Sequence, residues 1–102
     1  MQIAYSFKNI SPAEKAFCQS YFDGKLAKLQ KIIDRIYAEA CLDFRAEKFV
    51  KKSAYKVSLS IHSSPPFFVA EDDHTLPEAI DLALDKLVVD LRKVQEARKE
   101  KR

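Results

Sequence analysis

The apolar residues of this chain follow two periods, which divide it into strands and helices. In residues 2–8 apolar and polar positions alternate, as in a strand that buries one face. From residue 11 to residue 33 the apolar positions recur every three or four residues, which is typical of one helix face. This stripe consists of Cys18, Phe22, Leu26, Leu29 and Ile33. A capping box marks the beginning of the helix, because Ser11 and Glu14 can satisfy each other's free backbone amides on either side of Pro12.

Alternation returns after this helix. Residues 36–44 predict a second strand, and residues 45–53, with four basic side chains and one acidic side chain, predict an exposed cationic loop. Residues 54–62 and 67–71 alternate on either side of a proline pair and predict a hairpin of the third and fourth strands. Thr75 begins a second capped helix. Its apolar stripe is Leu76, Ile80, Ala83, Leu84, Leu87, Leu91 and Val94.

The order strand, helix, strand, strand, strand, helix predicts an α+β domain of two layers, in which a four-stranded sheet carries both helices on one face. The first strand–helix–strand unit favours a parallel pair of strands. A chain of 102 residues is long enough for one core and too short for two. We therefore expect a single domain over residues 1–95 and a basic tail over residues 96–102. Gly24, the only glycine, lies inside the first helix, and the sequence leaves open whether packing requires it.

The sequence contains no pattern for catalysis or for metal binding. Cys18 lies on the helix stripe and Cys41 in the second predicted strand, so both are interpreted as small buried hydrophobes. His62 and His74 have no partner at metal-ligand spacing, and the acidic residues 71–73 are explained by the start of the second helix. Neither a nucleophile–base pattern nor a glycine-rich phosphate loop occurs. We expect no enzyme, no cofactor, no metal and no small-molecule substrate.

Charge is distributed unevenly along the chain, although its net charge is only +3. Residues 1–56 carry eleven basic and six acidic side chains, residues 71–91 one basic and seven acidic, and residues 92–102 six basic and two acidic. This polarity favours an anionic partner that is met on one side of the protein. Neither a long apolar run nor a signal pattern is present, so we expect a cytoplasmic protein without membrane contact.

The basic residues of the two helices are the candidate binding residues. In the first helix they recur every three residues along one flank of the apolar stripe, and in the second they lie outside its stripe. The candidates are Lys25, Lys28, Lys31, Lys86, Lys93 and Arg92. If the helices lie side by side, these residues are expected to line a shared cationic cleft between or above them. From spacing alone, a solvated helix flank without any partner is the other interpretation.

Three segments carry a resemblance to a known family. They are Lys-Leu-Ala-Lys-Leu-Gln-Lys at 25–31, the segment 44–48, and Glu-Ala-Ile-Asp at 78–81 followed by Asp-Lys-Leu at 85–87. With the order of elements, they make nearly the whole chain resemble the ribosome hibernation promoting factors and the related ribosome-associated inhibitor, once called sigma-54 modulation proteins. The resemblance implies binding to the small ribosomal subunit with its 16S-type RNA, and we expect the protein to be a monomer. The same resemblance implies that the protein occupies the messenger and transfer RNA channel and blocks translation in resting cells.

The resemblance also implies which residues contact RNA. The basic positions of the family fall on the five candidate lysines, whereas a further basic position falls on Val89 and a usual tyrosine falls on Pro77. The first departure loses a phosphate contact, and the second loses a ring that can pack or stack. The chain ends where long forms of the family continue into a linker and a dimerising domain, so it resembles a short form.

Two other functions remain open from the sequence. The order helix, strand, strand, strand, helix is also that of double-stranded-RNA-binding modules, which would prefer naked duplex to ribosomes. Alternatively, Leu82 and Val89 beside Lys86 form an exposed docking patch of a protein–protein adaptor, whose partner would survive high salt.

Overall fold

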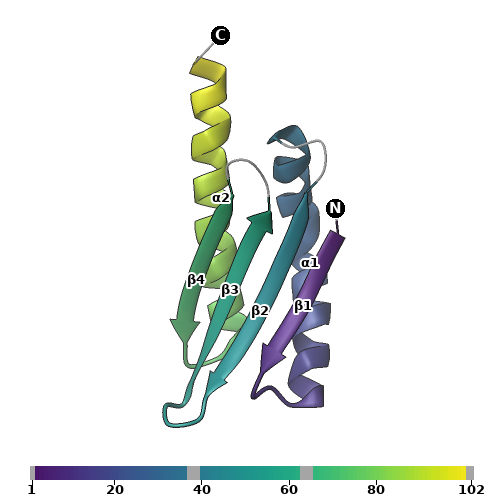
Figure 1. The fold of residues 1–102 in the computed structure, drawn as a ribbon, viewed down its shortest axis with the longest axis vertical. Helices are drawn as coiled ribbons and strands as arrows, with labels where there is room; N and C mark the ends of the chain where they lie inside the picture. Colours follow the sequence, from purple (N-terminus) through teal and green to yellow (C-terminus); the bar gives the residue numbers. More distant parts are fainter. Residues whose placement is uncertain (1, 37–39, 63–65, 101–102) are drawn as a thin grey trace.

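A computed structural model describes residues 2–36, 40–62 and 66–100 of the chain (Figure 1). Its elements are β1 (Gln2–Lys8), α1 (Pro12–Ile36), β2 (Cys41–Phe49), β3 (Ala54–His62), β4 (Phe67–Asp73) and α2 (Leu76–Glu100). The strands form one sheet in the order β1-β2-β3-β4, with β1 parallel to β2 and the other neighbours antiparallel. Both helices cover the same face of this sheet (Figure 1). The predicted two-layer α+β fold is confirmed.

Both helices begin at the predicted caps. The Ser11 amide donates to Glu14 Oε1 at 3.1 Å, and the Glu14 amide donates to Ser11 Oγ at 3.2 Å. At the second helix the amide of Glu78 donates to Thr75 Oγ1 at 3.4 Å. A Cβ atom placed on Gly24 would meet nothing within 4 Å, so packing does not require this glycine. The second helix continues to Glu100, into the segment predicted as a tail.

The second strand lies further along the chain than predicted. It spans Cys41–Phe49, so Ile36 belongs to α1, and the predicted loop over residues 45–53 is wrong for residues 45–49. Residues 37–39 of the predicted strand lie outside the described residues. The cluster of charges favours a loop, but the alternation continues beneath it, with Phe44 and Ala46 buried on either side of the exposed Arg45. In this segment the alternation of buried and exposed positions therefore determines the structure, and the high content of charged residues does not.

The core lies between the sheet and the two helices. Phe22 of α1 and Phe44 of β2 are fully buried, and their ring centroids are 5.0 Å apart. Tyr5 of β1 adds an edge contact to Phe22 at 6.4 Å. The predicted helix stripes are buried, apart from Leu26 and Val94, which are only partly buried. Among the described residues, no helix lies on the opposite face of the sheet (Figure 1).

The two cysteines differ in burial, because Cys41 lies on the face of its strand that points away from the helices. Cys18 is buried as predicted, and burial raises the pKa of its thiol to about 11. Cys41, by contrast, is exposed, so the prediction that both cysteines are buried is wrong. Because Leu42 and Phe44 face the helices, the odd-numbered residues of β2 point to the open side of the sheet. On β4, Phe68 is exposed and Phe67 is partly buried, as alternation predicts.

A hydrogen bond ties the start of α1 to β3. The Tyr55 hydroxyl donates to Glu14 Oε2 at 2.6 Å. This bond, together with bonds from Ser11, lowers the pKa of Glu14 below its ordinary value of 4.5. Because the pKa is depressed in the folded protein, ionised Glu14 stabilises the fold above its unfolded pKa. That contribution is lost as the pH falls through the folded pKa.

We therefore expect Tyr55→Phe to lower the free energy of unfolding by about 1 kcal/mol at about pH 7, because a charge-assisted hydrogen bond is lost. At about pH 3 the difference between wild type and variant should shrink, since Glu14 is then largely protonated in the unfolded chain and progressively so in the folded one. Urea unfolding at both pH values measures this. A difference that stays constant with pH would contradict the assignment of the bond to the ionised carboxylate.

Candidate nucleic-acid interface

The two helices lie side by side and enclose a groove of about 610 Å³, which we call the α1–α2 groove. Its residues are Gly24, Lys25, Ala27, Lys28 and Leu29 of α1, and Leu84, Asp85, Val88, Val89 and Arg92 of α2. The two helices thus form an apolar floor with charged side chains along its edges. Of the six candidate residues, the groove brings together Lys25, Lys28 and Arg92.

Lys25 is engaged by a neighbouring carboxylate. Its Nζ lies 2.8 Å from Asp81 Oδ1 on the other helix and 4.8 Å from the centroid of the Tyr21 ring. The Tyr21 hydroxyl donates to the same carboxylate, at 3.0 Å to Oδ1 and 2.9 Å to Oδ2. The hydrogen bond to Asp81 raises the pKa of Lys25. Lys25 therefore stays charged and joins the two helices, but its charge is compensated.

The remaining candidate lysines lie outside the groove. Lys86 Nζ is 3.6 Å from Glu71 Oε1 on β4, which places this side chain on the flank of α2 away from α1. Lys31 and Lys93 are exposed and do not line the groove. On an α-helix, residues six apart are rotated by about 120°, so the three-residue spacing carries Lys31 away from the face that holds Lys25. The contact of these residues with RNA stays a prediction.

Lys28 and Arg92 are the groove cations that form no ion pair with a described residue. Both are exposed, and neither forms an ion pair with any residue that the structure describes. Asp85 is the acidic residue in the groove wall. Val89 also lies in this wall, so the position at which the resemblance led us to expect a basic residue is apolar. Two cations on facing walls of an apolar groove suit the binding of a phosphate backbone.

Sequence reasoning missed two features of this region. Arg35 is exposed in the last turn of α1, seven residues after Lys28 and therefore on nearly the same face of the helix. That spacing was a readable signal. Asp81 gave no comparable signal, because its contacts with Lys25 and Tyr21 join two helices far apart in the sequence.

The surroundings of Pro77 show what replaces the expected tyrosine. Pro77 lines a shallow hollow with Phe17, and the Phe17 ring stacks on Tyr21 with 5.2 Å between centroids. Phe17 is 40% exposed. An accessible ring is thus present at this end of the helices, but it comes from α1.

The histidines make local contacts. His62 Nε2 lies 2.5 Å from Asp43 Oδ2, and His74 Nδ1 lies 3.1 Å from the carbonyl oxygen of Ser53. Within the part of the chain that the structure describes, no group of three metal-ligating side chains occurs. In the same residues no helix has the length and apolar character needed to cross a membrane.

Comparison with known proteins decides the family. The family model described as "Sigma 54 modulation protein / S30EA ribosomal protein" matches residues 3–99. The chain belongs to this family. The resemblance inferred from the three sequence segments and the order of elements is therefore confirmed, and the matched range includes residues of all six elements of the S30EA fold.

Solved structures agree with the S30EA fold. The N-terminal domain of Thermus thermophilus Protein Y has a TM-score of 0.66 and 22% identity, over 92% of this chain and 99% of that one. A ribosomal subunit interface protein from Coxiella burnetii has a TM-score of 0.60 and 17% identity, over 94% and 99%. At these identities the likeness supports the fold alone. A comparison with curated proteins gave no match.

Proposed function

We propose that this S30EA-family protein binds the small ribosomal subunit through the edges of the α1–α2 groove and inhibits translation while it is bound. The observation that carries the proposal is a pair of cations, Lys28 and Arg92, that lie on the two helices of one groove and form no ion pair with any described residue. Ribosomal RNA presents dense phosphates in irregular shapes, and cations bind them by releasing condensed counterions. The family description names a ribosomal protein, which favours this partner over other anions.

The proposed mechanism is occlusion and needs no catalysed reaction. The domain is elongated, with extents of 50 × 22 × 20 Å. A rod of this shape in the messenger and transfer RNA channel would exclude both ligands for as long as it stays bound. The proposal places the protein in the cytoplasm, as a monomer that acts in resting cells.

Salt dependence tests the proposal. We expect the protein to sediment with small subunits at low salt and to be released as salt rises. If it neutralises two to four phosphates, its affinity should fall about 10- to 150-fold between about 50 and 200 mM salt. Sedimentation at several salt concentrations gives the slope. Binding that does not change with salt would contradict the proposal, and tighter binding to naked RNA duplex would favour the double-stranded-RNA module instead.

Release of Lys25 should strengthen binding. In Asp81→Asn the carboxylate that compensates Lys25 is gone, so a third cation of the groove becomes available to phosphate. We expect roughly five-fold tighter binding to small subunits at about 50 mM salt. The cost in fold stability should be under about 1 kcal/mol, because the ion pair is solvent-exposed. Asp72→Asn on β4 makes the same change of net charge away from the groove, and an equal gain in both variants would contradict the role of Lys25.

The adaptor alternative rests on the exposed apolar residues of α2. Leu82 is 43% exposed and Val89 is 51% exposed, and their seven-residue spacing places them on one face of the helix. A protein partner that this face retains at high salt and after RNase treatment would favour an adaptor. Loss of every partner under those conditions would favour RNA.

A further inference from the structure

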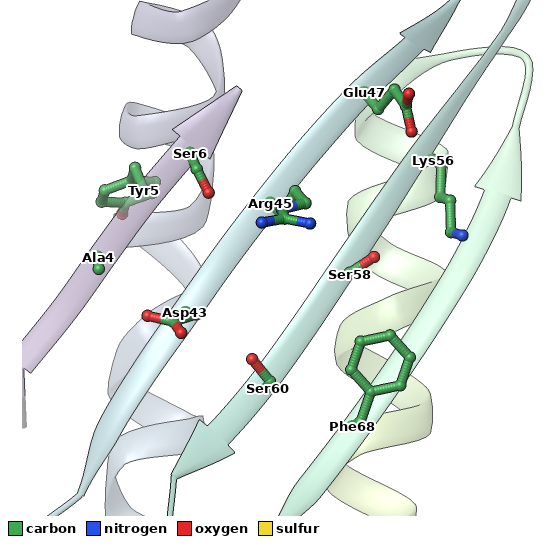
Figure 2. Close-up of a pocket in the computed structure, with 10 residues that line it drawn as sticks. All are labelled: Ala4, Tyr5, Ser6, Asp43, Arg45, Glu47, Lys56, Ser58, Ser60 and Phe68. Carbon is green, nitrogen blue, oxygen red and sulfur yellow. The ribbon is translucent and has the colours of Figure 1, made fainter. Parts of the chain in front are cut away.

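The open face of the sheet contains a hollow of about 480 Å³, which we call the open-face hollow (Figure 2). It forms where small side chains surround an arginine. Arg45 of β2 lies in register with Ser6 of β1 on one side and with Ser58 of β3 on the other. Ala4 and Ser60 continue the small side chains in the next row of the sheet. The Arg45 guanidinium therefore lies between β2 and β3 with little bulk around it (Figure 2).

The charged residues that line the open-face hollow differ in whether they have an ion-pair or hydrogen-bond partner. Each of the two carboxylates contacts a basic side chain or a histidine at the margin of the hollow. Asp43 Oδ2 lies 2.5 Å from His62 Nε2, and Glu47 Oε1 lies 3.4 Å from Lys8 Nζ. Among the described residues, the cations of the hollow that form no ion pair are Arg45 and Lys56. Lys56 has Glu47 and Asp72 in register on the neighbouring strands, whereas Arg45 has only Ser6 and Ser58. Arg45 is therefore the cation of the hollow with no carboxylate in register beside it, and this favours an anionic ligand.

An exposed aromatic ring completes the hollow. Phe68 of β4 is 67% exposed, and it lies in register with Ser60 of β3. The side chain of Lys56 extends along β3 toward Phe68 (Figure 2). Arg45 lies two strands from Phe68, or about 10 Å across the sheet. Proteins that bind single-stranded nucleic acids combine aromatic rings, on which bases stack, with cationic side chains that bind the backbone.

We propose that the open-face hollow binds one nucleotide, with its phosphate on Arg45 and Lys56 and its base stacked on Phe68. Unpaired nucleotides are recognised by stacking on aromatic side chains and by charge-assisted hydrogen bonds from arginine to phosphate. The hydroxyl of Ser60, which is partly exposed, can donate to or accept from the sugar. The nucleotide comes either from an unpaired RNA segment or from a free mononucleotide. The labelled side chains Arg45, Lys56 and Phe68 lie on the face of the sheet opposite the two helices, and therefore opposite the α1–α2 groove (Figure 2).

Binding of a fluorescein-labelled single-stranded pentanucleotide RNA to the full chain, measured by anisotropy, tests the proposal. Phe68→Ala should weaken binding between about five-fold and about a hundred-fold, because the stacking surface is lost. Arg45→Gln should weaken it by at least about ten-fold. Competition by adenosine monophosphate would show that a free nucleotide also fits, whereas RNA binding without competition would identify an RNA segment as the source. Both results support the site.

Matched controls separate this site from the rest of the surface. Phe17→Ala removes an exposed ring on the helix side, and Lys51→Gln removes a cation from the turn after β2, so both variants should bind like wild type. Absence of wild-type binding to both probes would overturn the proposal. So would RNA binding that Lys28→Glu abolishes and Phe68→Ala leaves intact, because the α1–α2 groove would then hold the RNA. Sedimentation with small subunits is a separate readout, so failure here is distinguishable from failure of the proposed function.

Discussion

Truncation of Phe22 to alanine is expected to lower the free energy of unfolding by about 3–5 kcal/mol. The Phe22 side chain is fully buried, 5.0 Å from the Phe44 ring and 6.4 Å from the Tyr5 ring between centroids. Its removal leaves a cavity where α1 packs on β1 and β2. Domains of this size have a total stability of about 5–15 kcal/mol, so the variant should be close to unfolding. Urea denaturation monitored by circular dichroism measures the loss.

Phe17→Ala is the matched control for this prediction. It removes the same side chain from the same helix, at a position that is 40% exposed. We expect the free energy of unfolding to fall by under about 1 kcal/mol, because Phe17 is partly exposed and its truncation leaves no buried cavity. Equal losses at the two positions would mean that the face of α1 with Phe22 does not pack on the sheet as described.

The fold was predictable where a local pattern was sufficient. Phe22 and the rest of its stripe could be read from the helical period, and both helix starts from capping residues that bond within four positions of each other. The second strand was misplaced because the cationic segment from Arg45 has the composition of a loop and the alternation of a strand. Pairing with the neighbouring strands makes this segment a strand. The pairing of β2 with β1 extends as far as Glu47, and its pairing with β3 extends as far as Phe49.

The candidate site was predictable only in part, because its charges are set by contacts between elements. The sequence showed basic residues on both helices, but it did not show that Lys25 meets Asp81 on the other helix or that Lys86 meets Glu71 on β4. A three-residue spacing also drifts around a helix, which carried Lys31 away from the groove. Tertiary contacts thus reduce the candidate residues to a smaller set of free cations inside the groove.

Reversal of both free groove cations, in Lys28→Glu/Arg92→Glu, is expected to weaken binding to small ribosomal subunits by at least about 100-fold at about 100 mM salt. Two phosphate contacts are lost, and two negative charges are placed where RNA phosphates would approach. The slope of log affinity against log salt should become shallower by about two, one for each lost contact. Sedimentation binding at several salt concentrations gives both quantities. The fold should persist, because both side chains are exposed.

Lys51→Glu/Lys52→Glu makes the same change of net charge at the turn between β2 and β3. These exposed residues lie outside the α1–α2 groove, so the affinity should stay within about three-fold of wild type at moderate salt, where distant charges are screened. Equal losses in the two double variants would show that net charge, and not the groove, determines binding. Wild-type affinity in the groove variant would reject the groove as the ribosome-binding surface, because the proposal assigns the phosphate contacts to Lys28 and Arg92.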